Sequence, residues 1–299
     1  MKDFSLEQMR TFVLVVERGG FSAAAAYLNL TQPAVSAQIR ELERRLGVRL
    51  VERLGRRVAP TAAGRELLAH ARAIEDQVAA ALQAVEGASQ GIWGRVRIGV
   101  GATACIHVLP PLLKDLRRRF PDLEIAVGTG NTLDVLRAIE ENAFDVGLVT
   151  LPAPGRIFQV TPVLDDEMVV IGPPGAGAPP AVAPPAWLAE APLILYESRG
   201  HTRRILDERL GRENLPLRPV MELGNIEAIK ELVAAGLGFG IVPRMAVAGA
   251  ISRGEIAAAS LAPPLFRTLA VVLRRDKPLS RGLRETVRVL ESLAGPRGQ

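Results

Sequence analysis

Hydrophobic residues recur at helical spacing over the first sixty positions. Three stripes are visible, running from Leu6 to Val16, from Phe21 to Leu28 and from Val35 to Leu46. Spacings of three and four residues place such positions on one face of an α-helix. Thr31 and Gly47 flank the third stripe, and these residue types commonly begin and end helices. We therefore predict three short helices around one small core.

A longer helical pattern follows from about Ala62 to Val85. Its apolar positions alternate between spacings of four and three, which is the heptad pattern of a helix that pairs with another helix. These positions are Leu67, Ala71, Ile74, Val78, Ala81 and Val85. The pattern predicts a dimerisation helix.

From Arg95 onward, short apolar segments alternate with helical ones. We predict buried strands at 96–100, 123–127, 145–149, 168–171, 193–196, 239–242 and 269–273, and a loop at 173–185. Such alternation is typical of an α/β domain with a mostly parallel sheet.

The outward face of the third predicted helix is small near its start and basic further along. Pro33, Ala37, Arg40 and Arg44 lie opposite the apolar stripe, with Ser36 at the edge. Small residues allow a helix to approach base edges, and arginines bind phosphates. Seven arginines oppose three glutamates between positions 40 and 57, so most of the formal net charge of +5 is local. This favours a helix-turn-helix with a basic wing, although a solvated basic face on an ordinary three-helix bundle would give the same pattern.

Cysteine and histidine usage excludes two kinds of site. Cys105 is the single cysteine, so an intramolecular disulfide is excluded. The three histidines are scattered and lack partners at metal-ligand spacing.

The first residues contain no apolar signal core, and no later segment is long and apolar enough to span a bilayer. We expect a cytoplasmic protein without a metal site or membrane contact.

Two other classes of protein share part of the pattern. Residues 99–104 match the relaxed glycine pattern of dinucleotide-binding turns, but the acidic residue expected at the end of the next strand is missing. The sequence contains no nucleophile elbow, P-loop or zinc-protease motif, so we do not expect an enzyme. A periplasmic solute-binding protein would explain the α/β part, but it would carry a secretion signal and would not need residues 1–90.

Four short motifs stand out in residues 12–64, namely Gly20-Phe21-Ser22, the run Thr-Gln-Pro-Ala-Val-Ser at 31–36, Leu46-Gly47 and Thr-Ala-Ala-Gly at 61–64. The resemblance of this segment to the DNA-binding domain of LysR-type transcriptional regulators rests on these motifs. It implies a winged helix-turn-helix at 1–61, a linker and dimerisation helix with a hinge at 62–92, and an effector-binding domain at 93–299. The effector-binding domain is expected to resemble a periplasmic-binding protein, with subdomains at about 93–163 with 267–299 and at about 164–266.

The resemblance also assigns DNA contacts to individual residues. Four positions match those that contact the groove, namely Gln32, Pro33, Ser36 and Ala37. Five match positions that bind phosphates, namely Thr31, Gln38, Arg40, Arg53 and Thr61. Arg56 lies where the wing of the family reaches the minor groove. Many members have arginine in place of Ala37, so base recognition here is expected to depend more on DNA shape.

Polar turns follow the predicted strands of the effector-binding domain. Strand ends of an open parallel sheet converge on one crevice, where ligands bind. The residues expected there are Gly101, Ala102, Thr103, Asn131, Thr132, Thr150, Ser198, Arg199 and Asn225. Helix N-termini at these turns favour an anion, and Arg199 is the expected closing charge. For Thr103, Asn131 or Asn225 taken singly, helix capping explains the residue equally well.

The resemblance implies several partners. They are double-stranded DNA, a second copy of the chain in a dimer and further in a tetramer, a small anionic metabolite acting as co-inducer rather than cofactor, and RNA polymerase. The turn at Glu197-Ser198-Arg199 resembles the branch of the family tied to sulfur and carbon assimilation genes.

Overall fold

The computed structural model describes residues 4–54, 57–86, 92–198, 200–211 and 217–295. The chain forms two compact units. The first comprises Met1–Gln90 with the short segments Glu141–Ala143 and Pro278–Arg281, and the second comprises Gly91–Glu140, Phe144–Lys277 and Gly282–Gln299. Within the described residues, no helix combines the length and hydropathy needed to cross a membrane.

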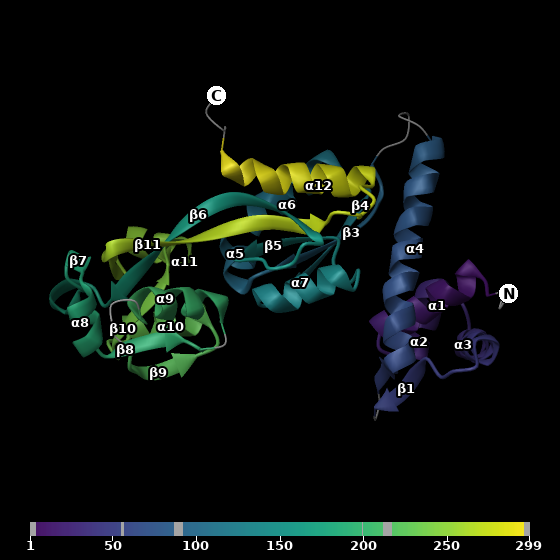
Figure 1. Cartoon of the computed structure of the whole chain (residues 1–299), viewed down its shortest axis with the longest axis horizontal. Helices are drawn as coiled ribbons and strands as arrows, with labels where there is room; N and C mark the ends of the chain where they lie inside the picture. The colour runs from purple at the N-terminus through teal and green to yellow at the C-terminus, as the bar shows by residue number, and fades with distance from the viewer. Residues whose placement is uncertain (1–3, 55–56, 87–91, 199, 212–216, 296–299) are drawn as a thin grey trace. The chain divides into compact units, whose positions relative to one another are not determined.

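The first unit begins with the three predicted helices, α1 (Leu6–Glu17), α2 (Phe21–Leu28) and α3 (Gln32–Leu46) (Figure 1). Thr31 caps α3 by accepting a hydrogen bond from the Ala34 amide at 3.4 Å. Gly47 ends α3 with a φ of 75°, a conformation that side chains other than glycine rarely adopt. Local sequence signals therefore set both ends of this helix.

The three helices enclose one small core. Its fully buried members include Met9, Phe12, Val35, Ile39 and Leu42. The sequence predicted that Leu6 begins the buried face of the first helix. This is wrong, because Leu6 is 56% exposed in the first turn of α1.

A β-hairpin follows the helices and forms the predicted wing. Strand β1 (Val51–Leu54) pairs antiparallel with β2 (Arg57–Pro60). The long helix α4 (Ala62–Glu86) begins directly after β2 (Figure 1). A Cβ atom on Gly64 would lie 2.0 Å from the Leu50 carbonyl oxygen, so α4 can start this close to the hairpin only with glycine there.

The predicted heptad seam on α4 divides into two parts. Ala71 is fully buried in the core of the three helices, and Leu67 packs partly against the same core. The prediction that Ala71 contacts a second chain is therefore wrong, because its own domain already covers it. Ile74 and Val78 are each 38% exposed, and Ala81 is exposed. Only the backbone of Val85 is described.

The second unit contains a nine-stranded sheet with the order β4-β3-β5-β11-β6-β10-β8-β9, and β7 pairs with β11. The strands are β3 (Gly94–Val100), β4 (Leu123–Thr129), β5 (Val146–Thr150), β6 (Phe158–Gly172), β7 (Val182–Ala183), β8 (Leu193–Tyr196), β9 (Pro219–Leu223), β10 (Phe239–Pro243) and β11 (Ala257–Arg274). Strands β4, β3 and β5 are parallel, as are β10, β8 and β9. The central strand β11 is antiparallel to both β5 and β6, and β6 is antiparallel to β10, so the sheet is mixed rather than mostly parallel.

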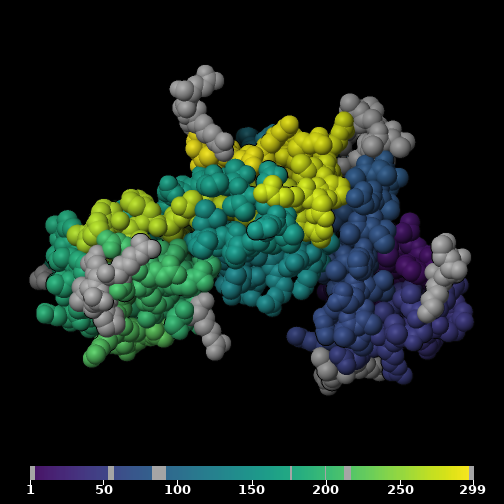
Figure 2. Space-filling view, viewed as in Figure 1, coloured from purple at the N-terminus to yellow at the C-terminus, as the bar shows by residue number. Residues whose placement is uncertain are grey.

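The strands and helices of this unit form two lobes, which can be followed by label in Figure 1 and by colour in Figure 2. Lobe I contains β3–β5 with α5 (Ala102–His107), α6 (Leu109–Arg119), α7 (Thr132–Glu140) and α12 (Arg281–Glu291). Lobe II contains β7–β10 with α8 (Pro185–Glu190), α9 (His201–Gly211), α10 (Ile226–Ala234) and α11 (Arg244–Ser252). The predicted loop at 173–185 holds only a 3-10 turn (Gly175–Gly177), β7 and the first residue of α8.

The long strands β6 and β11 pass between the lobes as one antiparallel pair (Figure 1). The predicted subdomain boundaries at 163/164 and 266/267 fall inside these two continuous strands. Their register places Arg267 directly opposite Asp166. The lobes are thus joined by paired backbone rather than by loose loops.

Candidate functional site

The first candidate site is the outer face of α3. Asn29 ends α2 in a left-handed conformation, with a φ of 54°, and the short turn to Thr31 brings α3 across α2. Gln32, Pro33, Ala37 and Arg40 are exposed on α3, and Ser36 is half-buried. The structure therefore presents the small and basic face that the sequence predicts for contact with DNA.

Ion pairs distinguish the arginines on this face. Glu41 binds Arg44 and Arg45, each with a closest contact of 2.6 Å. Hydrogen bonds from these two arginines lower the pKa of Glu41 to about 2. Arg40 is exposed and has no ion pair with a described residue. Its guanidinium is therefore ready to bind phosphate, whereas Arg44 would have to share its charge with Glu41.

Two of the predicted phosphate contacts already make hydrogen bonds inside the domain. The Gln38 amide accepts from the Thr11 hydroxyl and donates to Glu7 Oε1 at 3.0 Å, which ties α3 to α1. The Thr61 hydroxyl donates to the Arg49 carbonyl at 2.7 Å and accepts from the Gly64 amide at 3.0 Å. Both side chains therefore have structural roles, and their contact with DNA stays a prediction. Arg56 lies outside the described residues, and only the backbone of Arg53 is described.

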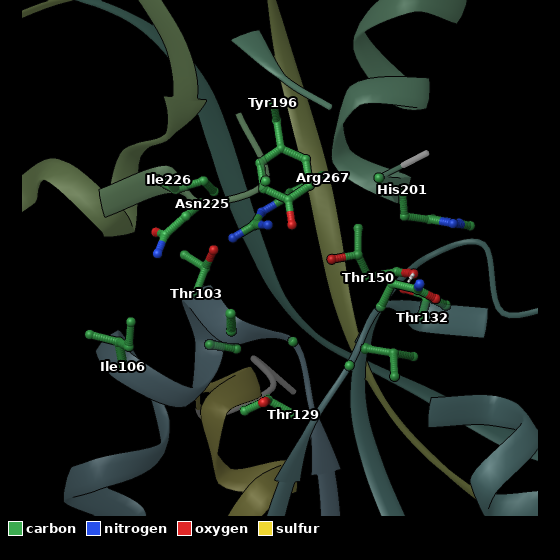
Figure 3. Close-up of a pocket in the computed structure, with 18 of the residues that line it drawn as sticks. Thr103, Ile106, Thr129, Thr132, Thr150, Tyr196, His201, Asn225, Ile226 and Arg267 are labelled. Carbon is green, nitrogen blue, oxygen red and sulfur yellow. Dashed lines mark hydrogen bonds between the residues drawn. The ribbon is translucent and has the colours of Figure 1, made fainter. Parts of the chain in front are cut away.

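The second candidate site is a cavity of about 360 Å³ between the two lobes. It lies where β3, β4, β5 and β8 end, and Figure 3 shows side chains from both lobes pointing into it. Seven of the nine predicted effector contacts line it, namely Gly101, Ala102, Thr103, Asn131, Thr132, Thr150 and Asn225. Ser198 does not line the cavity, and Arg199 lies outside the described residues.

Helix capping accounts for part of this lining. Asn131 Oδ1 accepts from the Asp134 amide at 3.0 Å, and Asn225 Oδ1 accepts from the Glu227 amide at 2.8 Å. The buried Thr132 hydroxyl donates to the Thr150 carbonyl at 3.0 Å. The Thr103 side chain has no hydrogen bond to a described residue. The Thr150 hydroxyl is also without such a bond, but Thr150 is buried whereas Thr103 is only partly buried, so Thr103 is the more accessible donor for a ligand.

Arg267 is the main residue that the sequence analysis missed. It lines the cavity from β11 and is only 4% exposed. Its Nε donates to Asp166 Oδ2 at 3.0 Å, and its Nη1 donates to the Thr202 hydroxyl at 3.2 Å. Its Nη2 lies 3.0 Å from the same carboxylate oxygen without hydrogen-bond geometry, and it has no other partner among the described residues. The cavity thus contains a buried cation with an unused N–H.

Burial lowers the pKa of Arg267, while the charge and hydrogen bond of Asp166 act in the opposite direction. A guanidinium nevertheless stays protonated in proteins. The signal in the sequence was an arginine inside an otherwise apolar strand segment, together with the acidic run Asp165-Asp166-Glu167. Only the register of β11 against β6 shows that Arg267 pairs with Asp166 of this run.

Two histidine contacts span the gap between the lobes. His201 on α9 lines the cavity, and its Nε2 lies 3.1 Å from the Pro152 carbonyl oxygen at the end of β5. Burial, and then the charge of Arg204, lowers the pKa of His201, so its ring is neutral at pH 7. On α5, His107 Nε2 lies 3.2 Å from Glu227 Oε1 at the start of α10.

Glu227 is ionised at neutral pH. Burial alone raises its pKa, but hydrogen bonds from Lys230 and His107 outweigh this and lower it. The Lys230 ammonium lies 2.6 Å from Glu227 Oε2. Within the part of the chain that is described, no group of three or more His, Cys, Asp or Glu side chains is placed to hold a metal ion.

Comparison with known proteins gives two family matches. Residues 6–65 match the bacterial regulatory helix-turn-helix proteins of the lysR family, and residues 89–294 match the LysR substrate binding domain. The regulator YeiE of Escherichia coli strain K12, itself described as uncharacterized, is 33% identical over 281 residues, or 94% of each chain. CbbR of Xanthobacter flavus is 32% identical over 92% of this chain and 84% of its own. Because the two identities are nearly equal, they support a CbbR-like branch only weakly.

Solved structures share the whole fold. A variant of full-length OxyR from Pseudomonas aeruginosa has a TM-score of 0.79 at 23% identity and covers 98% of this chain and 95% of its own. Full-length CbnR in complex with its target DNA has a TM-score of 0.65 at 21% identity and covers 97% of this chain and 100% of its own. The helix-turn-helix, the wing and the cavity between two lobes agree with both family matches. These matches show that this chain belongs to the LysR family of transcriptional regulators.

Proposed function

We propose that this protein binds its operator as a dimer and that a small molecule with an anionic group, held between the two lobes, controls it. Arg267 is the observation that carries this proposal. It is a buried cation that lines the cavity, and its Nη2 amino group has no hydrogen-bond partner among the described residues. A buried donor without a partner costs about 1–3 kcal/mol, and an anionic oxygen would remove that cost.

Neighbouring donors extend the same half of the cavity. Figure 3 shows Thr103, Asn225 and Arg267 directed toward a common space. The first turn of α7, at Thr132, adds backbone N–H groups at the positive end of a helix dipole. An anionic group placed here would contact residues of both lobes.

Control of DNA binding requires that the ligand favours one arrangement of the lobes over another. A ligand that touches Thr103 in lobe I and Asn225 in lobe II adds contacts only when the lobes are close together. The His201 and His107 contacts across the gap belong to the same arrangement. Ligand binding would therefore stabilise the closed cavity.

DNA recognition is assigned to α3 and the wing. Gln32, Ser36 and Ala37 face the groove in this proposal, and Arg40 binds a phosphate. Two-fold DNA sites need two such heads, and the exposed residues Ile74 and Val78 of α4 provide an apolar surface for a second helix. We further propose that two dimers form a tetramer and that the protein contacts RNA polymerase. We also propose that it is cytoplasmic and acts as a regulator rather than an enzyme.

Thr103→Val tests the effector half of the proposal. The change is nearly isosteric and removes a hydroxyl that bonds to no described residue. It should leave operator binding intact and weaken ligand binding about tenfold, as the loss of one hydrogen bond of 1–1.5 kcal/mol does. Thr161→Val is a matched control, because Thr161 is half-buried on β6 and does not line the cavity.

The measurement uses the full-length protein and its own upstream DNA. Thermal shift with sulfate, phosphate and short carboxylic acids selects a ligand, and calorimetry then compares the two variants. If Thr103→Val and wild type bind the ligand with equal affinity, the ligand does not bind in this cavity. Loss of operator binding without ligand would show that Thr103 serves the fold instead.

A further inference from the structure

We propose that the effector is a zwitterion, such as an α-amino acid, and that the Glu197 carboxylate receives its cationic group. The inference rests on the proposed function, because it names the class of ligand for the same cavity. Glu197 lines the cavity but is not among the donors proposed to bind the anionic group.

The charges that line the cavity do not suit a ligand that is only anionic. Among the described residues, those with charged side chains in its lining are Arg267, Glu197 and Glu227. The charge of Arg267 is balanced by Asp166 at 3.0 Å, and that of Glu227 by Lys230 at 2.6 Å. Glu197 is exposed and has no ion pair or side-chain hydrogen bond with a described residue. Among the described lining residues, the unbalanced charge is therefore negative.

The fold fixes where this negative charge lies. Glu197 directly follows Tyr196 at the end of β8, and its backbone amide donates to the Leu223 carbonyl at 3.0 Å. Its carboxylate oxygens lie 3.6 Å from the position that a Cβ atom on Gly224 would occupy. Gly224 also lines the cavity, so the carboxylate stands against the wall formed by the turn between β9 and α10.

Tyr196 lines the same cavity as both charged residues. Burial raises the pKa of the Tyr196 phenol, and the charge of the adjacent Glu197 raises it further. Tyr196 and Arg267 both line the cavity, and Figure 3 shows both side chains directed into it. A ligand in this one cavity can meet both the Arg267 guanidinium and the Glu197 carboxylate. Opposite charges on one small molecule match that pattern.

The size and the remaining lining agree with a small zwitterion. A cavity of about 360 Å³ is at the lower end of the usual range for ligand sites, about 300–1,000 Å³. Ile106, Ile226 and Leu269 line it as well. These residues leave an apolar region for a short side chain.

Glu197 also has a simpler structural explanation. A carboxylate near the start of α10 interacts favourably with the helix dipole and would contribute to stability alone. Asn225 already caps this helix through its side chain. The two explanations differ in ligand selectivity, which a purely structural role would leave unchanged.

The experiment compares Glu197→Gln with Glu190→Gln in the full-length protein. Glu190 is exposed at the end of α8 in the same lobe and does not line the cavity, so it is a matched control. The probes are the standard α-amino acids, the corresponding 2-hydroxy acids, which keep only the negative charge, and the corresponding primary amines, which keep only the positive one. Thermal shift selects the best amino acid, and calorimetry measures its affinity and that of its analogues.

We expect wild type and Glu190→Gln to bind the amino acid at least about tenfold more tightly than its 2-hydroxy analogue. Glu197→Gln should lower the affinity for the amino acid about tenfold and change that for the 2-hydroxy acid less than twofold, as loss of a charged hydrogen bond does. The inference would be overturned if wild type bound the amino acid and its 2-hydroxy analogue equally tightly. It would also be overturned if Glu197→Gln kept the wild-type preference for the amino acid. Either result would leave an anionic effector in place. Failure of every carboxylate-bearing probe to bind would also overturn the inference, whereas the proposed function would fall only if sulfate and phosphate failed to bind as well.

Discussion

Replacement of Arg267 by methionine is the sharpest test of the cavity. The change removes the guanidinium while keeping much of the aliphatic stem, so the packing around β11 is largely preserved. Asp166 then loses its partner at 3.0 Å and keeps only the Met245 amide, which donates to its Oδ1 at 3.1 Å. Both side chains of the pair are nearly inaccessible to solvent, at 4% and 5%.

The expected cost follows from this burial. Removing one partner of a buried ion pair leaves an uncompensated charge and costs about 3–5 kcal/mol. Typical domains have a free energy of unfolding of about 5–15 kcal/mol, so the single variant should be strongly destabilised. The double variant Asp166→Asn with Arg267→Met removes both charges and keeps an oxygen for the Met245 amide. It should recover most of the loss, because neutral replacement of a buried pair is often close to neutral in stability.

Urea unfolding of the full-length chain measures these differences. Trp187 packs edge-on against Phe239 with ring centroids 4.8 Å apart in the core of lobe II, so its fluorescence reports on the packing of that lobe. Calorimetry with the ligand found for wild type gives the second readout. The double variant should be folded and unable to bind that ligand tightly.

Two results would refute this reasoning. Equal stability of the single and double variants would show that the unpaired Asp166 charge is not what destabilises the fold. A folded double variant that binds the ligand with wild-type affinity would show that Arg267 does not hold the anionic group.

Three further predictions concern DNA binding, assembly and pH. Arg40→Ala should weaken binding to all DNA sequences alike and reduce the slope of log K against log salt by about one unit, measured by fluorescence anisotropy; an unchanged slope contradicts a phosphate contact. Ile74→Glu should bury a carboxylate between paired α4 helices, at a cost of several kcal/mol, and dissociate the dimer in light scattering; an intact oligomer with full operator affinity would remove α4 from this role. Burial raises the pKa of Asp145, but Arg97 and Lys277 together lower it below its ordinary 3.8, so the stability that it contributes above that value is lost as pH falls through the folded-state pKa. Asp145→Asn should therefore flatten acid unfolding below about pH 4, and an identical acid limb in both proteins would contradict the assignment.

The sequence alone determined the elements whose signals are local. Thr31 and Gly47 bound α3, and apolar periodicity located the buried face with Val35 and Ile39. These features depend on residues within a few positions of one another, so the chain encodes them without knowledge of the fold. The short parallel strands and their polar turns were predictable for the same reason, and parallel strand ends then brought Thr103 and Thr150 to one cavity.

Only the tertiary structure decided which neighbour covers each face. Periodicity on α4 identified an apolar stripe, but it could not show that Ala71 packs into its own domain while Ile74 stays exposed. In the same way, the polar face of α3 did not show that Gln38 bonds to α1.

The charge in the cavity depended on pairing between distant segments. Arg267 meets Asp166 because β11 and β6 run antiparallel in one register, although a hundred residues separate the two side chains. A buried arginine is tolerated only with such a partner, and a shift of one residue in register would turn its side chain to the other face of the sheet. Sequence periodicity specifies faces, whereas strand register specifies partners, and the partners determine the chemistry of this cavity.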